Sequence, residues 1–312
     1  MMKIQKILLL GGSGFIGTSL AEQLVERGYF VTVPTRRRER AKHLLLLPTI
    51  DIVEADIHNV DTLDALVRQH DCVINLIGIL HGDFEREHVA LPTLVAEACA
   101  KAGVKRLLHM SSLGADVNGP SQYLQSRGRG EQNVWAVAKR NPHLQVTVFQ
   151  PSVVFGERDQ FLNKFLSLIS LFPVIPLGSP GAKFQPVWVV DVARAIATSV
   201  ELSKTHGMTY PLVGPTVYTL KELVELVVTI SGKRRAVIGL PASLSTLQAA
   251  VFEFLPGKII TRDNLRSMRV PSTSNAPFPA LFGRASELES TVRSYMNATV
   301  GRAQYPRFRE RD

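Results

Sequence analysis

The stretch Leu8-Leu9-Leu10-Gly11-Gly12-Ser13-Gly14-Phe15-Ile16-Gly17 joins an apolar strand, a glycine-rich turn and the start of a helix. Glycines at positions 11, 14 and 17 allow a tight turn, close approach of a pyrophosphate to the main chain, and close packing of helix on strand. The phosphates would bind the free N–H groups at the helix N-terminus. Because the turn has both the strand and the helix that this motif requires, we predict a dinucleotide site formed by Gly11, Gly12, Ser13, Gly14, Phe15, Ile16 and Gly17.

Length and composition fit a protein with one large domain, or with a core and a smaller lobe. The chain has 312 residues, of which 45% are hydrophobic. Cys72 and Cys99 lie in apolar stretches, which predicts reduced, buried thiols, and no residue spacing predicts a metal site. We expect no signal peptide and no transmembrane helix, because a strand begins almost at Met1 and the apolar stretch 165–177 is short. These features predict the cytoplasm or an equivalent reducing compartment, with peripheral attachment at the inner membrane as an alternative.

The positive charge is concentrated in the last quarter of the chain. The net charge is +9, of which +2 belongs to residues up to 230 and +7 to those from Ser231 onward. Two interpretations are open: a solvated basic face, or a docking surface for an anionic membrane or an acidic partner protein. No nucleic-acid recognition motif accompanies the charge, so we do not expect nucleic acid as a partner.

Strand and helix patterns alternate through the first half of the chain. Strand patterns cover Lys6–Leu10, Phe30–Pro34, Ile50–Glu54, Cys72–Ile77, Arg106–Met110 and Gln145–Phe149. Helical patterns cover Gly14–Arg27, Val60–Gln69, His88–Ala102 and Gln122–Lys139. Strands separated by helices indicate a parallel sheet with right-handed crossovers. We therefore predict an α/β fold, a Rossmann-type doubly wound parallel sheet, with a smaller, mainly helical C-terminal lobe.

The second half is less regular, with helical patterns at Phe161–Leu171, Leu220–Ser231 and Ala242–Leu255. We expect a dinucleotide-binding core (1–155), an insertion into the small lobe (156–185), a return to the core (186–214), a lobe for substrate or partner (215–298) and a basic tail (299–312). The helix at 242–255 has two interpretations. It packs on the core of the lobe, or it presents an apolar face to a membrane or partner.

The end of the second strand distinguishes the two nicotinamide dinucleotides. An Asp or Glu there would bind the ribose hydroxyls of NAD, whereas guanidinium groups bind a 2′-phosphate. The strand ends at Thr35 without an acid, and Arg36, Arg37 and Arg38 follow. We predict NADP(H) in preference to NAD(H), bound by Thr35, Arg36 and Arg37. The alternative is that some of these arginines only solvate the next helix.

Two further segments follow strands at the same predicted edge of the sheet. Asp56 and Ile57 come after the third strand, where a carboxylate can meet the adenine amino group. Leu76, Ile77 and Gly78 end the fourth strand, and the glycine permits close backbone approach. We predict that these five residues line the dinucleotide pocket.

The sequence resembles the short-chain dehydrogenase/reductase superfamily in its extended or atypical branch. The motifs that carry the resemblance are the glycine spacing, Asp56-Ile57, Asn75-Leu76-Ile77-Gly78, Met110-Ser111-Ser112 and Gln150-Pro151-Ser152-Val153-Val154-Phe155-Gly156. Within this branch the chain is most similar to the accessory subunits of respiratory complex I with this fold and to their bacterial relatives. That similarity rests on residues 155–163, 185–193 and 255–263.

The resemblance implies a catalytic Tyr-x-x-x-Lys on a helix, with a Ser or Thr nearby. Tyr123 stands in the tyrosine position, but Arg127 occupies the lysine position. An arginine keeps the positive charge of the lysine. Its planar guanidinium group presents its donors in a different, fixed geometry, so its contact with the nicotinamide ribose must differ from that of a lysine. The serine position falls on Ser112 or, in another alignment, on Leu113. We expect Tyr123, Arg127 and Ser112 to form a degenerate catalytic set, in which Tyr123 packs on or hydrogen-bonds the nicotinamide nucleoside.

The resemblance also implies cofactor contacts from the ends of the fifth and sixth strands. These are Met110, Ser111, Gln150, Pro151, Ser152 and Val153. We expect Asp191 to cap a helix at Val192–Val200. His109 lies within a buried strand pattern, so we expect a core histidine there.

Three functions are compatible with these residues. The first is an NADP(H)-binding protein with weak or no turnover, which serves as a cofactor-binding subunit or assembly factor of a respiratory, complex I-like or other membrane-associated system. The second is an NADPH-dependent reductase or isomerase of an apolar carbonyl compound, such as a quinone or an isoprenoid-like molecule. The third is an interaction module with a vestigial pocket, which the complete glycine turn disfavours.

Overall fold

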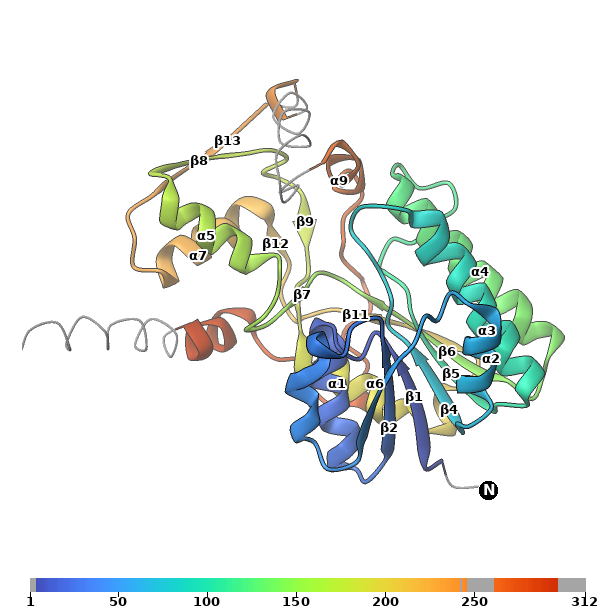
Figure 1. The fold of residues 1–312 in the computed structure, drawn as a ribbon. Helices are drawn as coiled ribbons and strands as arrows, with labels where there is room; N and C mark the ends of the chain where they lie inside the picture. The colour runs from blue at the N-terminus through green and yellow to red at the C-terminus, as the bar shows by residue number, and fades with distance from the viewer. Residues whose placement is uncertain (1–3, 242, 246–260, 297–312) are drawn as a thin grey trace, which may run out of the picture. The chain divides into compact units, whose positions relative to one another are not determined.

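The computed structural model describes residues 4–241, 243–245 and 261–296. Its main sheet has seven strands in the order β11-β6-β5-β4-β1-β2-β3 (Figure 1). The strands are β1 (Lys6–Leu10), β2 (Phe30–Thr35), β3 (Ile50–Glu54), β4 (Cys72–Asn75), β5 (Arg106–Met110), β6 (Gln145–Pro151) and β11 (Met208–Leu212). Every neighbouring pair is parallel. The predicted α/β fold with a Rossmann-type sheet is confirmed.

The strands read as continuous apolar runs because both faces of the sheet are covered. Helices α1 (Phe15–Glu26) and α6 (Val189–Ser199) cover one face, and α2 (Val60–Val67), α3 (Leu91–Ala102) and α4 (Gln122–Arg140) cover the other (Figure 1). The apolar stripes of α2, α3 and α4 pack on β1, β4, β5 and β6 in one cluster, which includes Leu8, Val73, Val95, Val134 and Val148. Strand order reverses between β1 and β4, which is where open α/β sheets bind ligands at their carboxyl edge.

Helix α6 differs from the expectation at its start. It begins at Val189, so Asp191 lies inside its first turn and the prediction that Asp191 caps a helix at Val192 is wrong. The Asp191 carboxylate is buried and forms an ion pair with Arg194 at 2.7 Å. Arg194 also donates to the carbonyl oxygen of Phe282, 2.7 Å away. Asp191 therefore fixes a guanidinium that holds another segment of the chain.

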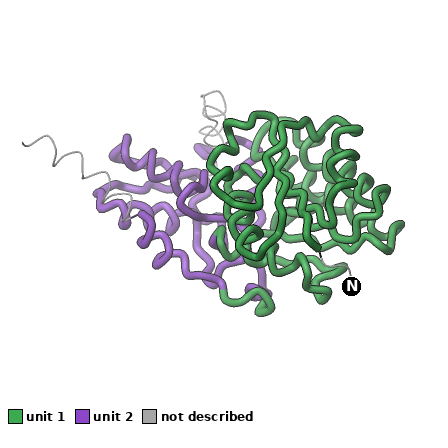
Figure 2. The backbone as a smooth tube through the Cα atoms, turned by 60° about the horizontal axis from the view of Figure 1, so that its bottom comes forward, with its two compact units in different colours: residues 1–151, 189–212, 279–284 green, residues 152–188, 213–278, 285–312 purple. Residues whose placement is uncertain are grey.

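The chain forms two compact units (Figure 2). The first contains residues up to Pro151 together with Val189–Leu212 and Pro279–Arg284, and so holds the whole main sheet. Its last segment carries η4 (Ala280–Phe282), in which Phe282 is buried against the rings of Phe149 and Tyr210. The first unit is thus assembled from three separate stretches of sequence.

The second unit contains Ser152–Trp188, Val213–Phe278 and the chain from Ala285 onward. Its helices are α5 (Leu162–Leu171), α7 (Leu220–Ile230) and α9 (Arg262–Ser267), and residues 288–296 are also helical. Short strand pairs join β7 (Val154–Phe155) to β10 (Val187–Trp188), β8 (Val174–Leu177) to β13 (Ala236–Gly239), and β9 (Lys183–Phe184) to β12 (Tyr218–Thr219). Its core includes Phe155, Ile169, Leu223, Val227 and Val292.

Two predicted features lie wholly or mostly outside the described residues. They are the helix at 242–255, apart from 243–245, and the basic tail at 299–312. Among the described helices, none combines the length and the apolar character that a bilayer-spanning helix requires.

Candidate functional site

The glycine turn between β1 and α1, called the glycine cradle below, is packed too closely to admit side chains at two of its positions. A Cβ atom on Gly12 would lie 2.7 Å from Cγ2 of Val33, and one on Gly17 would lie 2.2 Å from the carbonyl oxygen of Gly11. Gly11 has a φ of +83°, a conformation that favours glycine. Gly14 is the N-cap of α1 and has no side chain to cap the first-turn N–H groups. This geometry fits the pyrophosphate of a dinucleotide, which needs close main-chain approach and uncapped amides.

The remaining residues of the predicted turn surround this cradle. Ser13 is half-buried in the turn, and Phe15 and Ile16 open α1 with half-buried side chains. Phe15 and Ile16 belong to the first turn of α1, whose N–H groups have no side-chain cap.

The arginine segment after β2 is linked to the start of α1. Thr35 ends β2, and its hydroxyl donates to the carbonyl oxygen of Arg37 at 3.1 Å. Arg36 and Arg37 are exposed. Further along, in η1 (Arg38–Leu46), Nε2 of His43 lies 2.9 Å from the hydroxyl of Thr18 in α1. His43 was not among the predicted residues, because no pattern distinguishes an exposed histidine in a polar segment.

The segment after β3 lies next to the end of β2. The N–H of Ala55 donates to the carbonyl oxygen of Thr35 at 3.0 Å. The Asp56 carboxylate is exposed and accepts the N–H of His58 at 3.1 Å, which shapes the turn into α2. Ile57 packs against the cluster under α2 and α3. The structure therefore brings Asp56 and Thr35 to the same edge of the sheet.

The segment after β4 packs directly on the glycine turn. A Cβ on Gly11 would lie 3.4 Å from the backbone nitrogen of Ile77, and the N–H of Leu76 donates to the carbonyl oxygen of Leu10 at 3.0 Å. The side chain of Asn75 accepts the N–H of Ile77 at 3.1 Å. Leu76 and Ile77 are thus fixed against the cradle, and Gly78 follows them.

Arg127 lies buried at the ends of β4 and β5. It is 8% exposed, and its Nη1 donates to the carbonyl oxygens of Ile77 at 3.4 Å and Met110 at 3.2 Å. Its guanidinium carbon lies 5.6 Å from the centre of the Tyr123 ring. Ile77, Met110 and Tyr123 therefore lie around one guanidinium group. They come from three separate sequence motifs, each of which was predicted only individually.

Tyr123 lies in a small aromatic cluster that the sequence did not predict. Its ring meets Phe84 at 6.0 Å and His88 at 5.5 Å between ring centres, both edge-on. Nδ1 of His88 lies 2.9 Å from the hydroxyl of Ser126, which donates to the carbonyl oxygen of Tyr123. Phe84 directly precedes η2 (Glu85–Ala90), a single π-helical turn that carries His88. The contacts depend on a crossing of this segment with α4 that no local pattern reveals.

Both histidines near Arg127 are neutral. Burial, together with the charge of Arg127, lowers the pKa of His88 to about 2 and that of His109 to about 3. The expectation of a core histidine at position 109 agrees with its buried place in β5. Arg127 is therefore the positive charge at this point of the site.

Ser111 and Ser112 follow β5 and are buried. Within the described residues, neither hydroxyl has a hydrogen-bond partner, and the same holds for Nε of Arg127. Buried donors without partners are costly, so such groups commonly await a ligand or a water molecule. Leu113 is half-buried, and its N–H donates to the carbonyl oxygen of Pro151.

The end of β6 divides its predicted contacts between the two units. Gln150 donates from Nε2 to both carboxylate oxygens of Glu131, at 3.1 and 2.9 Å. Pro151 ends β6, whereas Ser152 and Val153 belong to the second unit. There the Ser152 hydroxyl donates to the carbonyl oxygen of Ser272 at 2.7 Å.

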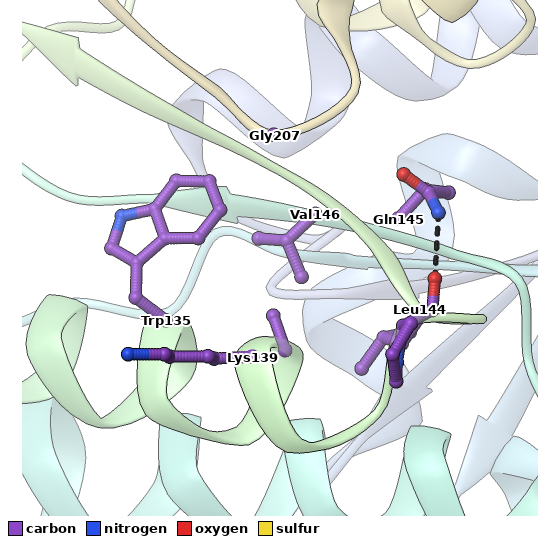
Figure 3. A pocket seen from close by; sticks show the side chains of 8 residues that line it. Trp135, Lys139, Leu144, Gln145, Val146 and Gly207 are labelled. Carbon is purple, nitrogen blue, oxygen red and sulfur yellow. Dashed lines mark hydrogen bonds between the residues drawn. The ribbon is translucent and has the colours of Figure 1, made fainter.

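Neither a metal cluster nor the surface pocket of Figure 3 coincides with these residues. In the described part of the chain, no group of three or more His, Cys, Asp or Glu side chains is placed to hold a metal ion. An open pocket of about 250 Å³ lies at the opposite edge of the sheet, where β6 and β11 begin (Figure 3). Trp135, Lys139, Leu144, Val146 and Gly207 are among its lining residues, and none of the predicted site residues is.

Comparison with curated proteins finds relatives in respiratory complex I. The chain is 30% identical over 243 residues to the mitochondrial NADH-ubiquinone oxidoreductase 40 kDa subunit of Neurospora crassa, covering 76% of this chain and 63% of that protein. It is 32% identical over 263 residues to the mitochondrial NADH dehydrogenase [ubiquinone] 1 alpha subcomplex subunit 9 of Arabidopsis thaliana, covering 80% and 64%. The chain thus spans slightly less than two thirds of the length of these relatives.

Solved structures share the fold at low sequence identity. The UDP-glucose 4-epimerase of Thermotoga maritima, solved with UDP-glucose, matches with a TM-score of 0.71 and 18% identity over 95% of this chain and 100% of that chain. The Thermus thermophilus UDP-glucose 4-epimerase, solved in complex with NAD, matches with a TM-score of 0.65 and 18% identity over 85% and 99%.

A family model described as the NAD dependent epimerase/dehydratase family matches residues 7–211, which is the stretch from β1 to β11. The resemblance to short-chain dehydrogenases/reductases, and within them to complex I subunits, is confirmed. With its glycine cradle, its parallel sheet and this match, the chain belongs to the NAD dependent epimerase/dehydratase family.

Proposed function

We propose that the protein binds NADP(H) with weak or no turnover and serves as a cofactor-binding subunit or assembly factor of a complex I-like respiratory system. The observation that carries this proposal is the glycine cradle, in which Gly12 and Gly17 have no room for a Cβ atom. Close packing of α1 on the turn, together with first-turn amides that no side chain caps at Gly14, is what this motif requires to bind a pyrophosphate.

The chain offers contacts for each part of the cofactor. The first-turn amides of α1 would hold the pyrophosphate, Asp56 would meet the adenine, and Arg127 or Tyr123 would meet the nicotinamide half. When bound, the nicotinamide would supply or accept a hydride. The donors of Ser111, Ser112 and Arg127 that lack partners in the described residues support a polar ligand at this edge.

The preference for NADP(H) is supported by charge at the end of β2. Arg36 and Arg37 are exposed there, and the Thr18–His43 contact keeps the following segment against the first turns of α1. Guanidinium groups bind a phosphate bidentately, whereas a carboxylate at this place would repel it.

Weak turnover is supported by the contacts of Arg127. The nitrogen that donates to Ile77 and Met110 is directed at backbone carbonyls rather than at the Tyr123 hydroxyl. A tyrosine acts as an acid or base most effectively when a nearby cation stabilises its phenolate. Arg127 instead stabilises the backbone.

Membership of a respiratory assembly is supported by the relatives and by one surface. Both curated relatives are named as subunits of the NADH–ubiquinone system. The second unit exposes Leu171, Phe172 and Val174, next to the place where Lys233 and Arg235 bond to α5. Apolar side chains with cations beside them suit a partner or lipid surface with negative charge.

The decisive experiment is to release and identify the nucleotide from protein purified without added cofactor. We expect NADPH or NADP⁺ in near-stoichiometric amount and no oxidation of bound NADPH by a panel of carbonyl and quinone compounds. Protein that is empty and does not bind added NADPH would overturn the proposal. In native gels of the source membranes, the tagged protein should migrate with complex I, and exclusively free protein would contradict the assembly role.

A reductase or isomerase of an apolar carbonyl compound is the second candidate. It is favoured by the retained Tyr123, whose ring lies half-buried beside Arg127. Under this alternative, NADPH is consumed with one substrate of the panel, and Tyr123→Phe lowers the rate by a hundredfold or more. If no compound of the panel oxidises NADPH, this alternative fails while the cofactor-binding proposal stands, because the parent protein and Tyr123→Phe would both still bind NADPH.

A further inference from the structure

Arg127 is a buried cation without an ionic partner. Among the described residues it forms no ion pair, although it is 8% exposed, and the two imidazoles beside it are neutral. Arg129, two residues later on the same helix, shows the ordinary surface arrangement. Its side chain is 48% exposed and pairs with Glu85 at 2.8 Å. A buried guanidinium costs free energy unless its donors are used, so the acceptors of Arg127 indicate its role.

Those acceptors are carbonyl groups at or just beyond the carboxyl ends of two adjacent strands. Nη1 of Arg127 donates to Met110, the last residue of β5, and to Ile77, two residues beyond the end of β4. At these points the main chain of β4 and of β5 leaves the sheet. The single nitrogen Nη1 carries two N–H groups, so it can donate to both carbonyl groups at once.

Gly78 leaves the space that this arrangement requires. A Cβ atom on Gly78 would lie 1.8 Å from Nη2 of Arg127 and 2.8 Å from its guanidinium carbon. Gly78 has a negative φ, so the backbone itself would accept another residue. The requirement for glycine at this position therefore comes from the guanidinium group.

We propose that Arg127 is a positioning residue that fixes the carboxyl ends of β4 and β5 by bridging the carbonyl groups of Ile77 and Met110, with Gly78 providing the space for its guanidinium. The bridge shapes the sheet edge at which a dinucleotide would bind, and to that extent the inference rests on the proposed function. Arg127, which stands in the lysine position, therefore acts on the main chain of the site rather than in proton transfer.

Backbone amides near the bridge report on it in the protein without cofactor. Leu76, Ile77, Ile79, Ser111 and Leu113 all donate their N–H groups within the structure. Hydrogen exchange measured by mass spectrometry should therefore show protection over 76–79 and 111–113. We expect Arg127→Ala to accelerate exchange in both segments at least tenfold, while the matched control Arg129→Ala leaves them unchanged. Equal exchange in the two variants would overturn the proposal.

The variant Gly78→Ala tests the same bridge without altering the arginine. Its methyl group should displace the guanidinium and reproduce the exchange pattern of Arg127→Ala. In the Arg127→Ala background the methyl group meets no guanidinium, so Gly78→Ala should then change exchange less than twofold. An effect of Gly78→Ala that is equally large in both backgrounds would show that the two residues act independently, which contradicts the proposal. If Arg127→Ala does not fold, Gly78→Ala alone should still accelerate exchange over 76–79 and 111–113 at least tenfold, and unchanged exchange there would overturn the proposal.

Affinity for NADPH, followed by its fluorescence, separates this inference from the proposed function. We expect Arg127→Ala and Gly78→Ala to weaken binding at least tenfold, and Arg129→Ala to leave it unchanged. If wild-type protein binds no NADPH, the proposed function fails, while the exchange pattern still decides whether the bridge exists. If binding is normal in both Arg127→Ala and Gly78→Ala, the bridge does not shape the site.

Discussion

The backbone N–H of Ile79 donates a hydrogen bond to Nε2 of His88 at 3.0 Å, so this nitrogen carries no proton and the ring donates from Nδ1 to Ser126. Protonation would destroy the first of these bonds and place a second charge beside Arg127. A histidine on η2 thereby connects the segment after β4 to helix α4 only while it is neutral.

Stability should therefore fall in acid. The folded pKa values of His88 and His109, about 2 and about 3, lie below the ordinary value of 6.5, so the unfolded chain binds protons first as the pH falls. Their contribution is complete above about pH 6.5 and decreases below it, by about 2 kcal/mol for each histidine at pH 5. Urea unfolding at pH 7.5 and pH 5 measures this loss.

Replacing one histidine should reduce the pH dependence by about half. In His88→Asn the difference between the two pH values should shrink, whereas the exposed His143 serves as the control, and His143→Asn should behave like the parent protein. A parent protein equally stable at both pH values would contradict the assignment of neutral, buried rings.

Arg106 should contribute strongly to the stability of the first unit. It is 2% exposed and donates to the carbonyl oxygens of Ser199 and Gln145 and to the hydroxyls of Thr147 and Thr205. Arg106→Met removes these bonds and leaves buried acceptors without donors, which we expect to cost about 3 kcal/mol. Urea unfolding checks this, with the exposed neighbour Lys105 as control. Lys105→Met should change stability by less than about 0.5 kcal/mol, and equal effects of the two changes would refute the prediction.

The arginines after β2 should determine cofactor preference. Arg36→Ala and Arg37→Ala each remove a guanidinium from the predicted 2′-phosphate contact, so NADPH affinity should fall about tenfold or more while NADH affinity stays constant. Titration calorimetry with both cofactors measures the difference. Arg40 lies in the same exposed segment, and Arg40→Ala is the control. Equal losses of affinity for NADPH and NADH would show that the arginines do not bind the 2′-phosphate.

Gly17 should tolerate no side chain. The methyl group of Gly17→Ala would meet the backbone of Gly11 and Gly12 at 2.2 to 2.7 Å, so α1 must move away from the turn. We expect a loss of about 2 kcal/mol or more in stability and no measurable dinucleotide binding. Gly181 has open space around its Cα, so Gly181→Ala should leave binding unchanged. Normal dinucleotide binding by Gly17→Ala would contradict the assignment of the glycine cradle as the pyrophosphate site.

Local patterns predicted the sheet closely. The bounds of β1, β3 and β5 agree with the expected strands, because apolar runs between turn signals are read directly from sequence. The bounds of helices were less accurate. The pattern starting at His88 begins with the π-helical turn η2, and α3 itself starts at Leu91. Close packing explains this irregularity, since a Cβ on Gly130 of α4 would lie 1.8 Å from the carbonyl oxygen of His88.

The site was predictable only as separate motifs. The glycine spacing, Asp56 and Tyr123 are recognisable by position in the sequence, because each follows a strand or opens a helix. The bridge from Arg127 to Ile77 joins residues 50 positions apart, and the bond between His88 and Ser126 joins residues 38 apart. Such contacts follow from the crossing of α4 over η2 and the strand ends, which single-sequence patterns do not encode.

The return of η4 to the first unit has a consequence for synthesis and for modular exchange. The ring of Phe282 packs on Phe149 and Tyr210, and its carbonyl oxygen accepts a hydrogen bond from Arg194. During synthesis, Phe149 and Tyr210 therefore stay uncovered until about residue 284 has left the ribosome. A gene fragment that stops after Leu212 would encode the complete parallel sheet yet leave an aromatic surface open to aggregation. The second unit cannot be exchanged as one continuous segment, because Pro279–Arg284, which lies between two of its stretches, belongs to the first unit.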